Sequence, residues 1–463
     1  MKVKKLFLSC LTILGIGTTQ MLHAQSTIPQ RELWVIGQNV VNFDGNSGNQ
    51  TTVNQLPVDN QTILDNNQPL PQDMYVSNAY HDEAGKLLFY IAAGKVYDWE
   101  GRFIGGLYEP NSVGFQIQSF KDIAILPDKC DPRVFYIVTS SDPSSPGHSA
   151  SNYQTVYYIK LEIGFNYNAV NYDLTPNFGG SPLGDPLADG RLGYINSVGV
   201  FGGSIPAMTP LFAANNTGQN DGNYTFAVSK KQADGEYLLV ATSGIEVAIY
   251  KGSDFAAAGN STPIPLFFNL QFGNQNGNIE TEIFQFQQSN LDILRVANIS
   301  STLNKLYYQD FEYAAGVINS SPPVLLNDIL NNASDFYSGL EFSKSGNYLY
   351  FTATNQSNIY PFPLTSRLSY FDLTQPNLGS QNITTSQLNY SIFNNFCVSQ
   401  IELGKDDALY FCSGAQLGRL NNTDNPTSII PSDFTAINLP IAYQRPNNVT
   451  FDWPYPMNDQ VDG

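Results

Sequence analysis

Apolar and polar residues alternate along many short stretches of the chain, and residues 336–352 show this most clearly. Leu340 and Phe342 alternate with polar residues before a short polar turn that contains a glycine. Leu349 and Phe351 continue the alternation after that turn. A period of two on both sides of a Gly-bearing turn predicts a half-buried β-hairpin.

Looser copies of this hairpin recur along the chain. Runs with similar alternation and turn residues lie at 76–98, 123–138, 154–163, 226–250, 294–310, 368–372 and 398–420. The turn centres fall near residues 85, 128, 234, 304, 346 and 406. The closest centres are about 42 residues apart, which is near the length of a four-stranded propeller blade. Residues 170–222 are rich in loop-forming residues, and we assign no strand there.

These patterns predict an all-β fold, and specifically a β-propeller. Long amphipathic helical patterns are nearly absent, whereas 27 Tyr, 29 Phe, 37 Gly and 27 Pro suit many short strands joined by turns. The length allows six to eight blades, and we expect seven. Radial repetition buries one face of each sheet on the next and leaves only short edges. A pair of β-sandwiches is the competing fold, but it needs no repeated hairpin.

Four of these segments appear in a familiar order along the chain. They are LLFYIAAGKVYDWEGRFIGG (87–106), DIAILPDKCDPRVFYIVT (122–139), SGLEFSKSGNYLYFT (338–352) and SQIELGKDDALYFCSGAQLGRLNN (399–422). Over most of residues 79–425 the chain resembles the secreted β-propeller region of Bacteroidetes surface proteins. Those proteins often end in gliding-motility-associated or type IX secretion sorting domains. The copy is degenerate, because Ser345-Gly346 and Asp406-Asp407 replace the Asp-Gly turn. The resemblance implies a propeller at the cell surface and implies no catalytic residues.

The first residues predict export. Lys2, Lys4 and Lys5 precede an apolar run, and a small-residue cleavage site ends at Ala24. We expect residues 1–24 to be a signal peptide and residues 25–463 to form a single β-propeller domain. Cys10 lies at the front of the apolar run, so a lipid anchor is not expected there. No later stretch is apolar enough to span a bilayer. No sorting domain is visible, so we expect another export route, a periplasmic protein or a single-domain relative.

Charge excludes some partners. The chain has 22 basic and 40 acidic side chains, and the expected signal peptide removes three of the basic ones. The mature formal charge is therefore about −21. Such a chain repels nucleic acid and anionic membrane surfaces at long range. We expect a soluble protein, secreted or at the cell surface, or in the periplasm, whose partner is an unidentified protein or glycan.

Three cysteines remain after the expected cleavage, namely Cys130, Cys397 and Cys412. This number is too small for a disulfide-built fold, so a hydrophobic core must hold the chain together. Cys397 and Cys412 flank one predicted hairpin but are out of register by a diagonal neighbour or more, so whether they are bonded stays open. No CxxC pair or Cys/His cluster indicates zinc.

Nucleophilic catalysis has little support in the sequence. His81 and His148 are the two histidines after the expected cleavage site. Residues 147–151, GHSAS, come close to a G-x-S-x-G elbow but lack its final glycine and its strand–turn–helix context. A carboxylate pair could instead cleave glycans, but 40 acidic side chains offer too many pairs for the sequence to select one.

Two further kinds of candidate have an ordinary structural explanation. The Asp/Asn/Gly loops at 44–49, 185–190 and 217–223 could bind structural calcium, although the same residues favour turns. Trp34 and Trp99 lie in or beside apolar strand patterns and suit core packing, whereas Trp453, between two prolines, is the better candidate for stacking on a sugar.

The sequence therefore predicts an exported, non-catalytic binding or scaffold propeller at a bacterial cell surface. The alternative is a carboxylate-dependent enzyme acting on polysaccharide. We assign no catalytic, cofactor-binding or metal-binding residue from the sequence. Two convergent carboxylates at the propeller axis with a flanking Arg or Tyr would favour the enzyme.

Overall fold

The computed structural model describes strands, several turns, one short α-helix and three 3₁₀ helices of this chain. The described residues are 33–36, 39–42, 52–55, 77–81, 87–92, 95–98, 103–107, 123–140, 155–163, 165–168, 173–176, 193–196, 199–201, 205–207, 209–213, 225–242, 246–258, 266–269, 278–288, 291–300, 305–314, 316–328, 335–355, 365–383, 401–404, 406–413 and 416–438.

Antiparallel sheets of four strands dominate the described residues. Four of them are β4–β7 (Ser77–His81, Leu87–Ala92, Lys95–Asp98, Phe103–Gly106), β17–β20 (Thr225–Val228, Leu238–Thr242, Glu246–Lys251, Leu266–Asn269), β26–β29 (Asp335–Phe342, Tyr348–Asn355, Thr365–Asp372, Gln381–Asn382) and β30–β33 (Ile401–Leu403, Leu409–Ser413, Gln416–Leu420, Phe434–Asn438). Sheet β21–β24 (Asn278–Gln288, Leu291–Ser300, Lys305–Ala314, Val317–Ser320) carries a fifth strand, β25 (Val324–Leu326), on β23.

Two sheets vary this pattern. The first sheet has three strands, β1–β3 (Leu33–Ile36, Asn39–Asn42, Thr52–Gln55). In the other, β8–β10 (Ile123–Pro127, Val134–Ser140, Thr155–Ile163) are followed by β13 (Gly193–Asn196) and β16 (Thr209–Ala213), which both pair with β10. Two small hairpins, β11–β12 (Phe165–Asn168, Asp173–Pro176) and β14–β15 (Gly199–Phe201, Ile205–Ala207), lie in the same stretch of chain.

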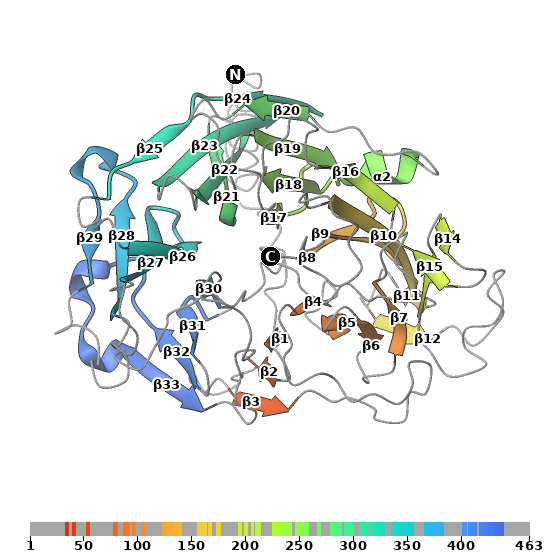
Figure 1. Ribbon diagram of the computed structural model, residues 1–463, viewed down its shortest axis with the longest axis horizontal. Coiled ribbons are helices and arrows are strands. Elements are labelled where there is room, and N and C mark those ends of the chain that lie inside the picture. The colour runs from red at the N-terminus through yellow and green to blue at the C-terminus, as the bar shows by residue number, and fades with distance from the viewer. Residues whose placement is uncertain are drawn as a thin grey trace, which may run out of the picture.

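The sheets stand around a common axis, as Figure 1 shows. The first strand of each sheet lies nearest the centre, and successive first strands are in contact in the order β1, β4, β8, β17, β21, β26 and β30. Sheets arranged radially in this way, each built as an up-and-down meander, define a β-propeller. The predicted all-β propeller is therefore confirmed. The predicted count of seven blades stays a prediction.

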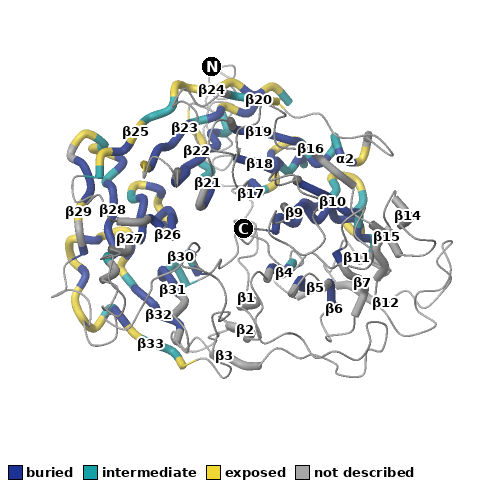
Figure 2. Tube along the Cα trace, viewed as in Figure 1, coloured by how far each residue is buried: buried dark blue, intermediate teal, exposed yellow. Residues whose placement is uncertain are grey.

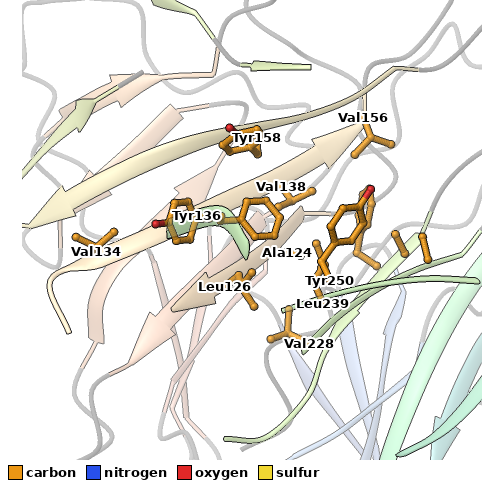
Figure 3. Packing of buried hydrophobic residues seen from close by; sticks show 14 residues of the cluster. Ala124, Leu126, Val134, Tyr136, Val138, Val156, Tyr158, Val228, Leu239 and Tyr250 are labelled. Atoms are coloured by element: carbon orange, nitrogen blue, oxygen red, sulfur yellow. The ribbon is translucent and has the colours of Figure 1, made fainter. Parts of the chain in front are cut away.

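The hydrophobic core lies between the faces of successive blades. One cluster of buried residues joins β8–β10 to β17–β19, and Phe255 of the short helix α2 (Gly252–Ala258) packs into it against Tyr136, Tyr158 and Tyr250 (Figure 3). Other clusters join β21–β25 to β26–β28, and β26–β29 to β30–β33. Each blade thus stabilises its neighbours by burying apolar area, in keeping with the small number of cysteines.

Burial falls from the axis to the rim (Figure 2). The described side chains of β17 are all buried, whereas the outer strands β24 and β33 each have a single buried residue among exposed or intermediate ones. This gradient explains which strands the sequence predicts well. Most inner and middle strands were predicted close to their observed bounds. Strands β2, β3, β7, β11, β20, β24, β25, β29 and β33 and the inner strand β21 were not predicted, and the stretch 170–222, to which we assigned no strand, contains β12–β16. Short strands, and strands in which polar residues interrupt the alternation as in β21, carry little hydrophobic periodicity.

The strongest predicted hairpin, β26–β27, has the expected turn. Gly346 adopts a φ of 68°, and a Cβ built there would lie 2.0 Å from Cε1 of Phe284 on β21. Position 346 therefore needs glycine both for its backbone conformation and for the close approach of the neighbouring blade. In the β30–β31 turn, Asp407 itself adopts a φ of 61°, which a small polar residue tolerates. This explains how an Asp-Asp turn can replace Asp-Gly.

Candidate functional site

Three buried glutamates converge near the centre of the ring. Glu280 and Glu282 belong to β21, and Glu402 belongs to β30; their relative exposures are 1%, 2% and 6%. One carboxylate oxygen from each residue lies within 4.8 Å of the others. Strand β26 lies between β21 and β30 in the ring, and the three strands stand near its centre (Figure 1).

The local structure of β21 explains why two of these side chains lie on the same face of the strand. Residues two apart in a strand share a face, so Glu280 and Glu282 point the same way. A β-bulge between Asn278 and Glu280 shifts the register with β22 just before the first glutamate. Bulges of this kind re-aim the side chains that follow them and are common beside active sites.

The other face of β21 fixes the strand to the preceding blade. Thr281, between the two glutamates, shares a hydrogen bond of 2.6 Å with the hydroxyl of Thr225 on β17 and donates another of 2.8 Å to Oδ1 of Asn298. Thr242 of β18 also contacts Thr225 and Thr281. These hydroxyl and amide groups are buried. The polar network therefore holds the glutamate pair at a defined position.

A fourth buried carboxylate borders the cluster from β26. Oε1 of Glu341 accepts a hydrogen bond of 2.6 Å from the N–H of Phe342, and Oε2 accepts one of 2.9 Å from the N–H of Leu403. Leu403 directly follows Glu402. Glu341 is 3% exposed and thus links β26 to the strand that carries the third glutamate.

Three carboxylates this close repel one another in a buried setting, so the site must compensate their charge with protons, a cation or basic side chains. Carboxylate oxygens are also ligands that hard cations such as Ca²⁺ prefer. An acidic cluster alone does not define a metal site, and we assign no ion to it. Chemically, the arrangement offers one carboxyl group as an acid beside another as a base or nucleophile.

Sequence reasoning did not select these glutamates. The signal that was present is an acidic residue inside an otherwise strand-like run, as in NIETEI at 278–283 and IEL at 401–403. Burying a carboxylate is costly, so acidic residues in an inner strand mark a special environment. Which strands lie at the centre is decided only by the tertiary structure.

Of the candidates taken from the sequence, His81 is placed on β4 and is buried. Cys130 is a free, exposed cysteine in the β8–β9 turn. The other candidates lie outside the described residues or have side chains that are not described. They are His148, the segment 147–151, the loops 44–49, 185–190 and 217–223, Trp34, Trp99, Trp453, Cys397 and Cys412. Calcium binding by these loops, the roles of the tryptophans and a bond between Cys397 and Cys412 therefore stay open.

No protein family and no curated protein matches this chain in the comparisons made. Among solved structures, the catalytic domain of an α-L-arabinofuranosidase from Coprinopsis cinerea aligns with a TM-score of 0.31 and 12% identity, covering 72% of this chain and 93% of that one. An α-L-arabinanase from Penicillium chrysogenum, complexed with arabinobiose, aligns with a TM-score of 0.32 and 10% identity. The alignment covers 69% of this chain and 85% of that one.

An endo-arabinase from Bacteroides thetaiotaomicron gives a TM-score of 0.27 and 9% identity, covering 72% of this chain and 96% of that one. All three neighbours are glycan-active enzymes by name. At TM-scores this low, the likeness carries no argument about what this chain does. Within the described part of the chain, no helix is long and apolar enough to cross a membrane.

Proposed function

We propose that this protein is a glycan-active enzyme that uses carboxylates at the propeller axis. The single observation that supports this is the convergence of Glu280, Glu282 and Glu402 from two inner strands. Glycoside hydrolysis needs two carboxyl groups on opposite sides of the scissile bond. The working pair would therefore combine Glu402 from β30 with one of the two glutamates of β21.

The spacing also suggests a stereochemical outcome. Carboxyl groups about 5–5.5 Å apart suit retaining hydrolysis, whereas inverting enzymes leave about 6.5–9.5 Å for a water molecule. The oxygens of the cluster lie within 4.8 Å of one another, which is nearer the shorter spacing. In that scheme one carboxylic acid protonates the glycosidic oxygen while the other carboxylate attacks the anomeric carbon. Water then releases the sugar.

A second candidate function is the non-catalytic binding or scaffold module. The burial of the three glutamates favours it, because a polysaccharide reaches side chains that are 1–6% exposed only if the axis opens. In this alternative the cluster sets the shape of the ring centre and recognition occurs elsewhere. Under both candidates we infer an exported protein, secreted, at the cell surface or in the periplasm, whose partner is a glycan or a protein rather than nucleic acid.

The test is hydrolysis by the chain from residue 25 onward, screened against a broad panel of polysaccharides and aryl glycosides. Glu402→Gln should lower kcat/KM by roughly 10²–10⁴-fold, the range expected for loss of a general acid or base. Glu312→Gln is the matched control, because Glu312 is an exposed glutamate on β23. Retention of configuration in the first product, followed by NMR, would support the spacing argument.

Two results would overturn the enzyme proposal. The first is no cleavage of any substrate by folded protein. The second is cleavage that Glu402→Gln, Glu280→Gln and Glu282→Gln all leave unchanged. Binding of a glycan without cleavage would favour the second candidate.

A further inference from the structure

The hairpin formed by β21 and β22 extends past the first turn of the next blade. Strands β21, β22 and β23 have 11, 10 and 10 residues, whereas β26 and β27 of the next blade have eight each. Gly346 of the β26–β27 turn lies against the ring of Phe284. Phe286 lies two residues further along β21, toward the end of the hairpin where Gln288 pairs with Leu291. The next blade therefore covers Phe286 only in part, and its side chain is half-buried.

An arginine and an aspartate lie beside Phe286 on the same face of the sheet. Arg295 of β22 pairs in register with Phe284 of β21 and with Asp310 of β23. Its Nε and Nη2 donate hydrogen bonds of 2.7 and 2.8 Å to the two carboxylate oxygens of Asp310. The guanidinium carbon lies 5.2 and 4.7 Å from the ring centroids of Phe286 and Tyr308. The bidentate ion pair and the two rings together hold the guanidinium in one orientation.

This ion pair keeps donors and acceptors for a further ligand. The side chains of Arg295 and Asp310 are 18% and 25% exposed. A guanidinium has five N–H donors, of which the pair uses two, and each carboxylate oxygen can accept a second hydrogen bond. Within the described part of the chain, Nη1 of Arg295 has no hydrogen-bond acceptor. Phe286 adds a half-buried apolar ring directly beside these polar groups.

A neutral sugar fits this combination of groups better than a charged ligand does. A hydroxyl group both donates and accepts, so neighbouring hydroxyls can accept from Arg295 while they donate to Asp310. The C–H face of a sugar ring can pack against the apolar ring of Phe286. The ion pair has no net charge, and the chain has 40 acidic and 22 basic side chains. An anionic ligand would therefore gain little at this position and would be repelled at long range.

Phe286 lies on the same face of β21 as the central glutamates. Glu282, Phe284 and Phe286 alternate along the strand, and four residues of strand span about 13 Å. We propose that Phe286, Arg295 and Asp310, which we call the Arg295 patch, form a binding site for a neutral glycan. The proposal rests on the proposed function where it takes the glycan as a substrate, held in line with the central carboxylates. Binding at the patch can be measured without cleavage.

The test is affinity electrophoresis in native gels that each contain one polysaccharide. The neutral probes include xyloglucan, galactomannan, arabinan and a β-glucan, and the acidic probe is polygalacturonate. Every protein carries Glu402→Gln, so that cleavage does not remove the probe. At least one neutral probe should retard the folded protein. Asp310→Ala and Phe286→Ala should each raise the Kd for that probe by roughly 10-fold or more, because each removes a direct contact with the sugar.

Two matched controls separate binding from ordinary packing. Phe268 is half-buried on the outer strand β20 and packs against Phe311, so Phe268→Ala removes an aromatic ring away from the patch. Lys305 is exposed at the first position of β23, five residues from Asp310, so Lys305→Gln removes a charge from the same strand. Both controls should keep Kd within about twofold of the parent protein, since neither residue belongs to the patch. If Asp310→Ala does not fold by circular dichroism, Asp310→Asn replaces it.

Three results would overturn the proposal. They are no retardation by any neutral probe, retardation by polygalacturonate alone, and equal affinity in the parent, Asp310→Ala and Phe286→Ala. The enzyme proposal fails in a different way. A protein that binds a neutral glycan through the patch but hydrolyses nothing keeps the patch and loses only the enzyme. Hydrolysis of aryl glycosides that depends on Glu402, without binding of any neutral polysaccharide, would keep the enzyme and lose the patch.

Discussion

Asp328 and the three central glutamates are buried carboxylates in different parts of this propeller. The side chain of Asp328 is 3% exposed and accepts hydrogen bonds from Arg367 at 2.5 Å, Tyr337 at 2.6 Å and Ser380 at 2.5 Å. The central glutamates instead lie within 4.8 Å of one another. Donors surrounding an acid stabilise a fold, whereas acids gathered together raise the energy of the charged state. The contrast separates a structural carboxylate from a candidate functional one.

The pKa of Asp328 reflects this. Burial by itself raises the pKa of this carboxyl, but hydrogen bonds from Ser380, Tyr337 and Arg367 outweigh burial and hold its pKa below the ordinary value of 3.8. The charged form is thus the stable one in the folded protein. Asp328 connects the segment after β25 to strands β26, β28 and the residue before β29, so it closes the outer side of one blade.

The largest expected loss in the free energy of unfolding comes from removing the hydrogen bonds of Asp328. Asp328→Ala leaves the guanidinium of Arg367 without its carboxylate and should lower the free energy of unfolding by about 3–5 kcal/mol, as when one partner of a buried ion pair is removed. Urea unfolding followed by circular dichroism measures it. Exposed Glu312→Ala, the control, should stay within about 0.5 kcal/mol. A loss of that small size for Asp328→Ala would contradict the structural role.

The next largest effect concerns the contact between Phe284 of β21 and Gly346 of the β26–β27 turn. Phe284 follows Glu282 by two residues on the same face of β21, and its ring covers Gly346. Gly346→Ala combines backbone strain with a clash and should cost about 2–4 kcal/mol. Gly316→Ala is the matched control, because Gly316 has a φ of 85° but its nearest neighbour, Nζ of Lys251, is 3.5 Å away. It should cost only about 1 kcal/mol. Equal losses would show that the Phe284 contact is unimportant.

The sharpest test of this comparison is whether substituting Glu402 raises the free energy of unfolding, whereas substituting Asp328 lowers it. Glu402→Gln takes one carboxylate away from two others, so at pH 8 it should raise the free energy of unfolding by about 1 kcal/mol if repulsion outweighs the remaining contacts of Glu402. The same urea titration measures this change. Destabilisation of the size expected for Asp328→Ala would instead mean that the charge of Glu402 is compensated and structural.

The smallest expected effect is on the acid limb of stability. A carboxyl whose pKa is lowered by folding contributes stability that is fully present above its unfolded value and is lost as pH falls through the folded value. For Asp328 the loss begins as pH falls below about 4. Asp328→Asn should therefore flatten the dependence of Tm on pH between pH 5 and pH 2, by roughly a few degrees. Parallel curves for wild type and variant would refute this assignment.

Hydrophobic periodicity alone was enough to predict most of the inner and middle strands, but not β21, which carries two of the central glutamates. The bounds predicted for 87–92, 95–98 and 416–420 coincide with β5, β6 and β32, because alternating Leu, Tyr and Phe residues bury one face on the next blade. The turn at Gly346 follows from its glycine in the same way. Outer strands such as β29 were not predicted because they are defined by pairing with the neighbouring inner strand, here β28, and not by a pattern of their own.

The central cluster shows where sequence reasoning ends. The sequence determined that the chain is all-β, acidic and built from repeated hairpins, because these properties depend on composition and on residues close together in the chain. Only the tertiary structure decided that Glu280 and Glu282 meet Glu402, and that Glu341 of β26 bonds to the backbone of β30 beside Glu402. Ring closure brings β21, β26 and β30 to one axis, and their separation along the chain carries no local signal of that meeting.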